Sequence, residues 1–352
     1  MARRHFYVII NSTKIAMDAP LKACAKRIIN PVTQWILRGL LGVLFKPSVR
    51  WPPTPATSPL LASTLLGALL KRSTRWLRNQ VYLAYAVAAG EKYFCHDTKS
   101  GSYVVNLADD GVSRELFLFG YFDLEIFQRA LQVLGREGLG RPQVLLDVGA
   151  NIGTVSIHAL ITGAFSRAIG IEANSHNARL LRANVHLNGL EGKFIIVEAA
   201  AAGESDLQLN LELAVGNLGD HRIRCLASDG IFDEGSRKTE SVNSVTIDDL
   251  LAKQGIDPKN CFMWMDVQGY EGEVLLGARQ FLMAGAPIVF ELWPYGLRRA
   301  NTYDKLVASL AGYSYFIDLR DPMLTRCSLD KLQELYESFP DSYAHTDILV
   351  WK

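Results

Sequence analysis

Cysteine is scarce in this sequence and is not clustered. The five cysteines among 352 residues are scattered, and none forms a Cys-x-x-Cys pair. An odd, dispersed set of this kind argues against a disulfide framework and against a zinc site built from clustered thiolates. The sequence therefore predicts a protein of a reducing, cytoplasmic compartment.

Long apolar runs are also missing. The longest apolar stretches near the N-terminus are residues 32–45, which Arg38 interrupts, and residues 59–70. Both are shorter than the roughly 20 residues that a membrane-spanning helix needs. The apolar run at residues 6–10 is shorter than a usual signal-peptide core and is not followed by a clear cleavage site. We expect a chain that is neither exported nor membrane-spanning.

Acidic side chains are nearly absent from the first quarter of the chain. Residues 1–90 hold 13 Lys and Arg but one acid, Asp18, for a net charge of +12, whereas the remaining 24 basic and 35 acidic residues give residues 91–352 a net charge of −11. Such asymmetry is typical of two segments with different roles. We predict a basic helical N-terminal extension over 1–90 and a main domain over 91–352, with a lead-in at 91–140 and a core at 141–352.

The extension is predicted to contain two helices, over 33–44 and 60–88, separated by a linker at 46–59 that holds five prolines. These helices could pack on the main domain or on a partner subunit. Alternatively, their arginines and aromatic residues could hold them peripherally at the inner face of a membrane. No nucleic-acid motif supports a third reading, nucleic-acid binding. The oligomeric state stays open.

The main domain alternates between strand and helix patterns. Two short β-like runs, at 103–107 and 116–119, and a helix at 124–135 come first. The predicted strands that follow are 144–148, 168–172, 194–198, 207–213, 242–245, 261–267, 287–292, 314–319 and 346–351. The predicted helices between them are 154–160, 177–187, 247–253, 271–284, 302–310 and a stretch near 329–336. Repeated βα units predict an α/β fold with a doubly wound, Rossmann-like parallel sheet that binds ligands beyond the carboxyl ends of its strands.

A glycine-containing turn follows the first buried strand of this pattern. Residues 144–154 read VLLDVGANIGT, which places Asp147 before Gly149, Asn151 and Gly153. A dinucleotide fingerprint starting at Gly149 would need glycine at 151 and 154, where Asn151 and Thr154 stand instead. Asp147 would repel a phosphate but attract the ammonium and sulfonium of S-adenosylmethionine. The turn therefore favours a cationic cofactor.

Two more acids stand at successive strand ends. Glu172 follows the second strand, where an acid can accept hydrogen bonds from both ribose hydroxyls of a nucleotide. Glu198 follows the third strand, where it could accept from the amino group of an adenine packed on Ala199 and Ala200. Together with Asp147 they predict a cofactor site along three strand ends.

Residues 115–352 contain a set of motifs: DVGANIG at 147–153, IEAN at 171–174, Asn184 with Asn188, VTIDDL at 245–250, and MDVQGYE at 265–271 with Glu291. Together these motifs resemble the FkbM family of S-adenosylmethionine-dependent methyltransferases. The resemblance implies a class I methyltransferase fold with a seven-stranded sheet of order 3-2-1-4-5-7-6 whose last strand is antiparallel. It also implies O-methylation of hydroxyls on sugars, glycolipids or related natural products.

The resemblance also implies roles for single residues. It places Asp147, Gly149, Asn151 and Gly153 in the cofactor loop, Glu172 on the ribose and Asp266 at the reaction centre. Gly120 and Glu125 match the family's lead-in, near the cofactor or substrate.

This chain departs from the family at Gln268, where the Asp-x-Glu-Gly pattern has glutamate. The neutral amide can bind a substrate hydroxyl but cannot take its proton.

Methyl transfer to an alcohol needs a group that removes the hydroxyl proton. The candidates are Asp266, Glu291 and His221. We expect Asp266 or His221 to act as the base and Glu291 to orient the acceptor. Asp266 and Glu291 could instead share Mg²⁺, although two carboxylates are explained more simply as a hydrogen-bonded pair.

Other functions remain open at this stage. A non-catalytic S-adenosylmethionine-binding scaffold at a membrane assembly would account for Gln268, and a sugar oxidoreductase that uses NAD is disfavoured by Asn151 and Thr154. The expected acceptor is a sugar-containing or lipid-linked small molecule.

Overall fold

The chain divides into two compact units, Met1–Gly90 and Glu91–Lys352. The structure is a computed structural model that describes Asn79, Tyr82 and residues 93–226, 229–340 and 343–352. The helices and the linker predicted over residues 33–88 therefore lie outside the described residues, apart from Asn79 and Tyr82. Among the described residues, no helix combines the length and apolar character that crossing a bilayer requires.

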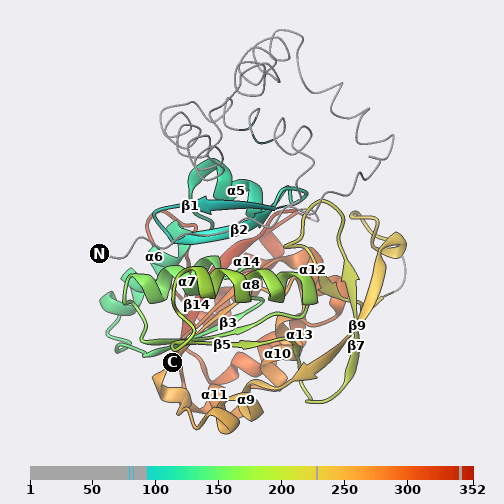
Figure 1. Cartoon of the computed structure of the whole chain (residues 1–352). Helices are drawn as coiled ribbons and strands as arrows, with labels where there is room; N and C mark the ends of the chain where they lie inside the picture. Colours follow the sequence, from blue (N-terminus) through green and yellow to red (C-terminus); the bar gives the residue numbers. More distant parts are fainter. Residues whose placement is uncertain (1–78, 80–81, 83–92, 227–228, 341–342) are drawn as a thin grey trace, which may run out of the picture. The chain divides into compact units, whose positions relative to one another are not determined.

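The second unit is built on one large mixed sheet (Figure 1). Its strands are β3 (Val144–Val148), β4 (Arg167–Ile171), β5 (Phe194–Val197), β10 (Cys261–Met265), β11 (Ile288–Leu292), β12 (Tyr315–Asp318), β13 (Arg326–Ser328) and β14 (Thr346–Trp351). They lie in the order β13-β12-β14-β11-β10-β3-β4-β5. Strand β14 runs antiparallel to both of its neighbours, β11 and β12.

This order is the expected 3-2-1-4-5-7-6 arrangement with an additional strand. Counted from β5, the first seven positions match it, including the antiparallel seventh strand in chain order, β14. The eighth strand, β13, pairs antiparallel with β12 at the edge of the sheet, so the sheet is eight-stranded rather than seven-stranded. Every residue of the central strands β3 and β10 is buried, which explains why both appear in the sequence as continuous apolar runs.

Helices cover both faces of the large sheet. One face carries α5 (Val112–Phe119), α6 (Leu124–Arg136), α7 (Thr154–Ile161) and α8 (Ser175–Leu187). The other carries α9 (Ile247–Gln254), α10 (Glu271–Leu276), α11 (Arg279–Ala284), α12 (Pro294–Ala300), α13 (Tyr303–Ser309) and α14 (Leu332–Ser338). In β3, Leu145 packs into the first layer and Leu146 into the second, as strand geometry requires.

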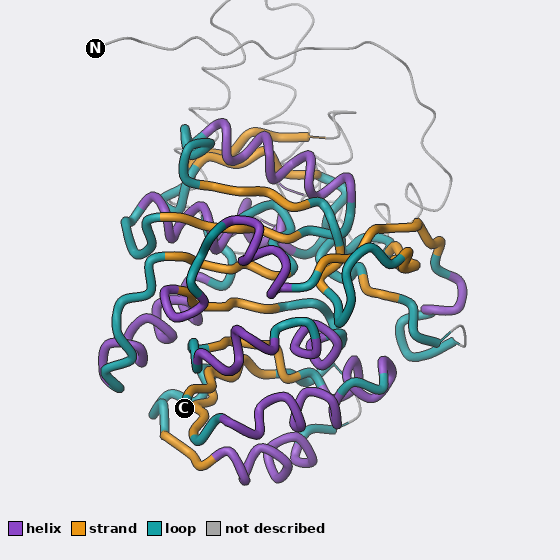
Figure 2. The backbone as a smooth tube through the Cα atoms, turned by 90° about the horizontal axis from the view of Figure 1, so that it is seen from below, coloured by secondary structure: helices purple, strands orange, loops and turns teal. Residues whose placement is uncertain are grey.

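Two smaller sheets complete the unit. Strands β1 (Tyr93–Asp97) and β2 (Ser102–Asn106) form an antiparallel hairpin. Strands β6 (Ala200–Ala201), β9 (Lys238–Val245), β7 (Gln208–Leu213) and β8 (Arg222–Ile223) form a four-stranded sheet in that order. Figure 2 shows this sheet as a separate group of strands beside the large one. It is an insertion between β5 and β10, and its loops reach the candidate site.

Two predicted elements differ from the structure. Residues 116–119, expected as a strand, belong to α5, because the Asp109 carboxylate accepts hydrogen bonds from the N–H groups of Gly111 and Ser113 and Gly120 ends the helix at φ 80°. The single helix expected over 271–284 is broken at Gly277. A side chain there would meet the carbonyl oxygen of Ala202 at 2.1 Å, so close backbone packing interrupts the helix.

Candidate active site

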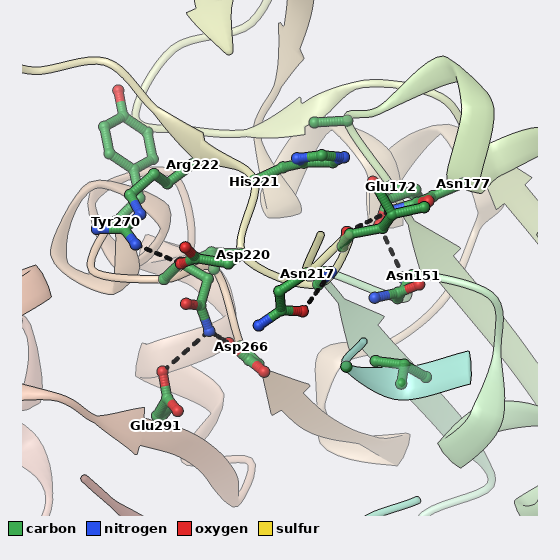
Figure 3. A pocket seen from close by; sticks show the side chains of 18 of the residues that line it. Asn151, Glu172, Asn177, Asn217, Asp220, His221, Arg222, Asp266, Tyr270 and Glu291 are labelled. Carbon is green, nitrogen blue, oxygen red and sulfur yellow. Dashed lines mark hydrogen bonds and ion pairs between the residues drawn. The ribbon is translucent and has the colours of Figure 1, made fainter. Parts of the chain in front are cut away.

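The carboxyl ends of the central strands open into one cavity of about 610 Å³ (Figure 3). Eight predicted site residues line it: Asp147, Gly149, Asn151, Glu172, His221, Asp266, Gln268 and Glu291. The sheet order brings them together, since β4, β3, β10 and β11 are consecutive neighbours. In Figure 3, Asn151 and Glu172 lie on one side of the cavity, and Asp266 and Glu291 on the other.

The glycine turn after β3 packs directly on the loop after β10. Gly149 has φ 87°, and a Cβ atom on it would lie 1.9 Å from the carbonyl oxygen of Asp266. The N–H groups of Gly149 and Ala150 both donate to the carbonyl oxygen of Ile171, at 2.9 and 3.0 Å. Only glycine permits this approach, so Gly149 fixes the spacing between the two halves of the site.

Gly153 has a packing role instead of the predicted place in the cofactor loop. It lies outside the residues that line the cavity, and a Cβ atom there would meet Leu181 Cδ1 at 2.5 Å. With φ 89° it precedes α7 and lets that helix pack closely on α8. The structure thus explains Gly153 by packing, and its predicted contact with the cofactor stays a prediction.

Glu172 is held rigidly by two backbone donors. Its Oε2 accepts from the N–H of Asn151 and its Oε1 from the N–H of Asn174, both at 2.8 Å. Burial raises the pKa of Glu172 to about 7, against the lowering effect of these two hydrogen bonds. The Asn151 bond links the glycine turn of β3 to the end of β4.

Asp147 is the most enclosed of the acids at the glycine turn, at 3% exposed. The hydroxyl of Ser156 on α7 donates to its Oδ2. Burial is the main cause that raises the pKa of Asp147 to about 6, and the charge of Asp266 adds to it. A cation bound here would favour the ionised form of this carboxyl group.

Asn177 on α8 is a site residue that sequence reasoning missed. Its Nδ2 donates to the carbonyl oxygen of Leu218 at 2.9 Å, while its Oδ1 is buried with no hydrogen-bond partner among the described residues. The side chain lines the cavity near Glu172 (Figure 3). A buried acceptor without a partner is costly, so Asn177 Oδ1 is a candidate contact for a ligand donor. Its place in the first turn of the helix after Glu172 was the available signal.

Glu198 lies outside the cavity, so the structure gives no support to its predicted adenine contact. It is absent from the cavity lining, its side chain is 38% exposed, and it forms an ion pair with Arg182 Nη1 at 2.7 Å. The strand β5 lies at the edge of the large sheet, so its end is farther from the central opening. The small residues Ala199, Ala200 and Ala201 do line the cavity.

Glu125, predicted at the substrate, lies on the exposed side of α6. It accepts a hydrogen bond from the Tyr121 hydroxyl at 3.1 Å and does not line the cavity. Gly120, from the same lead-in, ends α5 and also stays outside the cavity. The acid that does line the cavity is Asp123, two residues earlier, whose pKa burial and the neighbouring Asp347 raise to about 7. The turn between α5 and α6 therefore reaches the site through a different residue.

His221 lines the cavity but is poorly suited to act as a base. The N–H of Ala214 donates to its Nδ1 at 3.0 Å, so the neutral ring carries its proton on Nε2. Burial lowers the pKa of His221 to about 4. Its acceptor nitrogen is thus occupied and its other nitrogen is a donor, which contradicts the predicted role in proton removal.

Asp266 and Glu291 meet through Gln268. The Nε2 of Gln268 donates to Asp266 Oδ1 at 2.7 Å and to Glu291 Oε2 at 3.2 Å. His345 Nε2 lies 3.7 Å from Glu291 Oε1 on the far side of that carboxyl group. The predicted pairing of the two carboxyl groups is therefore indirect. The amide nitrogen of Gln268 makes contacts within the protein, and the predicted contact of this residue with a substrate hydroxyl stays a prediction.

Further charged groups surround this pair. Asp347 at the start of β14 lines the cavity and forms an ion pair with Arg320 Nε at 2.7 Å. Burial raises the pKa of Asp266 and of Asp347, and raises that of Glu291 well above its ordinary value. Among the described residues, no group of three or more His, Cys, Asp or Glu side chains is arranged to hold a metal ion.

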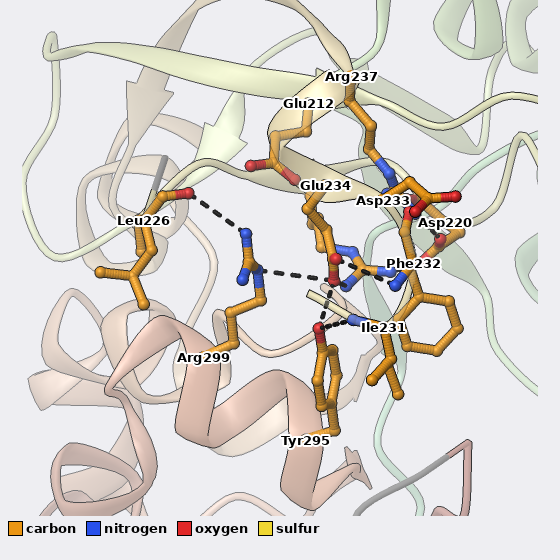
Figure 4. A network of polar contacts seen from close by, with 12 residues as sticks. Glu212, Asp220, Leu226, Ile231, Phe232, Asp233, Glu234, Arg237, Tyr295 and Arg299 are labelled. Atoms are coloured by element: carbon orange, nitrogen blue, oxygen red, sulfur yellow. Dashed lines mark hydrogen bonds and ion pairs between the residues drawn. The ribbon is translucent and has the colours of Figure 1, made fainter. Parts of the chain in front are cut away.

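The segment of the insertion that lies between β7 and β9 builds one wall of the cavity around a buried carboxylate. Glu234 is fully buried and accepts hydrogen bonds from Arg222 Nη1 at 3.0 Å and from the Tyr295 hydroxyl at 2.7 Å (Figure 4). Arg299 Nε lies 3.6 Å from the same carboxylate oxygen. Because Tyr295 and Arg299 belong to α12, this network fastens the insertion to the large sheet's helical layer.

Aromatic side chains cover the cavity side of this network. Phe232 packs edge-on against Trp293 and Tyr343, with ring centroids 5.5 and 4.4 Å apart. The guanidinium of Arg222 lies 5.0 Å from the Phe232 ring and 4.8 Å from the Trp293 ring. All four side chains line the cavity. The wall thus offers aromatic surface next to the Asp266 and Glu291 pair.

Residues 147–316 match the family model described as the methyltransferase FkbM domain. This matched segment, a little under half of the chain, is thus similar to the FkbM methyltransferase domain. This match includes the glycine turn, the insertion and the Asp266 loop, whereas β12 is only partly inside it and β14 lies beyond it.

The solved structures found to be similar to this protein have low sequence identity to it. A methyltransferase FkbM from Methylobacillus flagellatus KT is 15% identical, with a TM-score of 0.37, 69% of this chain and 55% of that chain covered. A Pyrococcus abyssi tRNA (uracil-54, C5)-methyltransferase in complex with S-adenosyl-L-homocysteine is 13% identical, with a TM-score of 0.37, 74% of this chain and 44% of that chain covered. The tRNA m1G37 methyltransferase of M. jannaschii is 12% identical, with a TM-score of 0.38, 80% of this chain and 69% of that chain covered.

The chain thus spans about half the length of the first two of these proteins. A search of the curated proteins found no match.

Proposed function

We propose that the FkbM domain catalyses S-adenosylmethionine-dependent O-methylation of a hydroxyl group on a sugar, glycolipid or related natural product. The observation that carries the proposal is one cavity lined by Asp147 and Glu172 on one side of the glycine turn and by Asp266 and Glu291 on the other. The first pair suits a cationic nucleoside and the second suits proton removal from an alcohol. The match to the methyltransferase FkbM domain supports methyl transfer as the type of reaction.

The residues present fit this cofactor. Asp147 and Glu172 supply carboxyl oxygens, and Asn177 Oδ1 supplies a buried acceptor without a partner among the described residues. The bare backbone at Gly149 allows close approach to the turn. When bound, S-adenosylmethionine supplies a methyl group activated by a positively charged sulfur atom.

Asp266 is the base in this proposal. It directly follows β10 and lines the cavity, where its carboxyl group would receive the proton of the acceptor hydroxyl while Oδ1 accepts from Gln268. Glu291 orients the acceptor from the end of β11. His221, whose Nδ1 accepts from the N–H of Ala214, takes no proton in this proposal. A positioned base commonly contributes about 10²- to 10⁴-fold to such a reaction.

The aromatic wall of the cavity indicates which chemical class of acceptor it could bind. Phe232 and Tyr343 line the cavity in front of the buried Trp293, and the face of a sugar ring can stack on such aromatic surface while its hydroxyls reach Glu291. Val215 and Ile231, 97% and 52% exposed, extend the apolar lining outward. This arrangement fits a sugar that carries an apolar group. The peripheral membrane contact expected of residues 1–90 stays a prediction.

Calorimetric titration of the full chain with S-adenosylmethionine and with NAD tests the cofactor. We expect one S-adenosylmethionine site and no measurable NAD binding. Replacement Glu172→Ala should weaken S-adenosylmethionine binding at least tenfold, which corresponds to about 1.4 kcal/mol.

The matched control for this titration is Glu198→Ala, which removes a glutamate at the neighbouring strand end but outside the cavity. It should bind S-adenosylmethionine like the unaltered chain. Tight binding of NAD without binding of S-adenosylmethionine would instead support the oxidoreductase alternative and overturn the proposal.

A further inference from the structure

Gln268 has an unusual backbone conformation, and its side chain contacts two carboxyl groups. It has φ 57°, in the left-handed region that non-glycine residues seldom adopt, and it follows the end of β10 by three residues. From there its amide nitrogen reaches carboxyl groups on two neighbouring strands, Asp266 Oδ1 at 2.7 Å and Glu291 Oε2 at 3.2 Å. Each of its two N–H hydrogens can serve one carboxyl group.

A glutamate in this place would change the charge balance of the cavity. Its carboxyl group would stand within hydrogen-bond distance of two others, so at least one additional proton would be needed to join them. The amide of Gln268 donates to both groups at any pH at which the protein is folded. The bridge between β10 and β11 is therefore independent of protonation in this chain.

The surroundings of the bridged pair favour ionisation of one partner. The shorter hydrogen bond goes to Asp266, as expected for an ionised acceptor. Burial and the charge of Asp347 raise the pKa of Asp266, whereas hydrogen bonding from Gln268 and the nearby His345 act to lower it. The pKa of Glu291 is raised by burial and then by acids on several elements, namely Asp266, Asp347, Glu271 and Asp123. Asp147, Glu172 and Arg320 are further charged groups near this cluster.

We propose that Gln268 is a positioning residue that bridges Asp266 and Glu291 so that Asp266 stays ionised beside a protonated Glu291. The inference rests on the proposed function, because it assigns Asp266 as the base of that reaction. It also gives Glu291 a proton with which to donate a hydrogen bond to an oxygen of the acceptor. Unequal protonation of two neighbouring carboxyl groups is a general way to divide acid and base roles.

The pH dependence of stability tests the bridge without any cofactor or acceptor. We expect Gln268→Glu to place a carboxyl group whose pKa is raised in the folded state. Such a group binds its proton more tightly when folded, so stability falls as pH rises from its ordinary pKa of about 4.3 through the raised value. In urea unfolding of the full chain, the ratio of the unfolding constants of the variant and the unaltered chain should increase tenfold or more between pH 5 and pH 8.

Two further variants make this result specific. Gln132→Glu makes the same change on the exposed side of α6 and should leave the ratio of unfolding constants nearly constant over this range. Gln268→Asn keeps an amide and tolerates the left-handed backbone, but its side chain is one methylene shorter and cannot span both carboxyl groups. In the pH profile of the methyl-transfer rate, this variant should move the acidic limb to higher pH, because Asp266 then loses the side-chain amide that donates a hydrogen bond to it.

A ratio for Gln268→Glu that is as constant as that for Gln132→Glu would overturn the bridge. The bridge would also be overturned if the acidic limb of the pH–rate profile did not move in the Gln268→Asn variant. If the unaltered chain transfers no methyl group, the proposed function fails, and the unfolding measurements still decide whether Gln268 bridges two carboxyl groups.

Discussion

Asp266→Asn should lower the rate of methyl transfer by about 10²- to 10⁴-fold, the usual contribution of a general base. The substitution keeps the shape of the side chain and an oxygen that can accept from Gln268, so the loop after β10 should keep its structure. Affinity for S-adenosylmethionine should change little, because Asp147 and Glu172 are untouched. The measurement is the rate at saturating cofactor, with affinity measured in parallel by calorimetry.

Asp233→Asn is the control for this effect. Asp233 also lines the cavity, but it is exposed and lies in the insertion. Its replacement should leave the rate unchanged. If Asp266→Asn keeps more than a tenth of the activity, the proton is removed by another group, and Glu291 becomes the first alternative.

Gly149→Ala adds a single methyl group to the site and should strongly reduce the stability of the fold. The new Cβ would lie 1.9 Å from the carbonyl oxygen of Asp266, and alanine disfavours the φ of 87°. The loop that carries Asp266 must then move away from the glycine turn. We expect the free energy of unfolding to fall by about 3 to 5 kcal/mol, the range seen when strain and core disruption combine. Binding of S-adenosylmethionine should be lost as well.

Gly163→Ala separates the backbone effect from the steric one. Gly163 has φ 71°, but an added Cβ would meet no atom within 4 Å. Its substitution should cost only about 1 kcal/mol, the value of a left-handed conformation for a residue with a side chain. Equal destabilisation by both substitutions in urea unfolding would show that the close contact with Asp266 has no special importance.

The sequence was sufficient to predict that Asp147, Gly149 and Glu172 come together in one cavity, because their placement depends on local order. Asp147, Gly149 and Glu172 stand at the ends of buried strands, and adjacent parallel strands bring such ends together. The same reasoning failed for Glu198, because β5 is an edge strand and Arg182 pairs with that carboxylate. Position at a strand end thus does not reveal which way a side chain turns.

Long-range contacts account for the other differences. The hydrogen bond from Ala214 that fixes the protonation of His221 joins two ends of a loop in the insertion, and no local pattern announces it. Asp123 rather than Glu125 reaches the cavity because of the turn between α5 and α6. Gln268 could be recognised in the sequence as a departure from the family, but its contact with Glu291 depends on the pairing of β10 with β11.

Transfer of a labelled methyl group tests the central claim most directly. The full chain would be incubated with methyl-labelled S-adenosylmethionine and a cell extract, which is then separated into lipid-linked, polysaccharide and small-molecule pools. We predict that label enters a sugar-containing pool as a base-stable methyl ether, and that Asp266→Asn reduces it by about 10²-fold or more. Binding of S-adenosylmethionine without transfer of label to any pool would contradict the account and identify a binding scaffold instead of an enzyme.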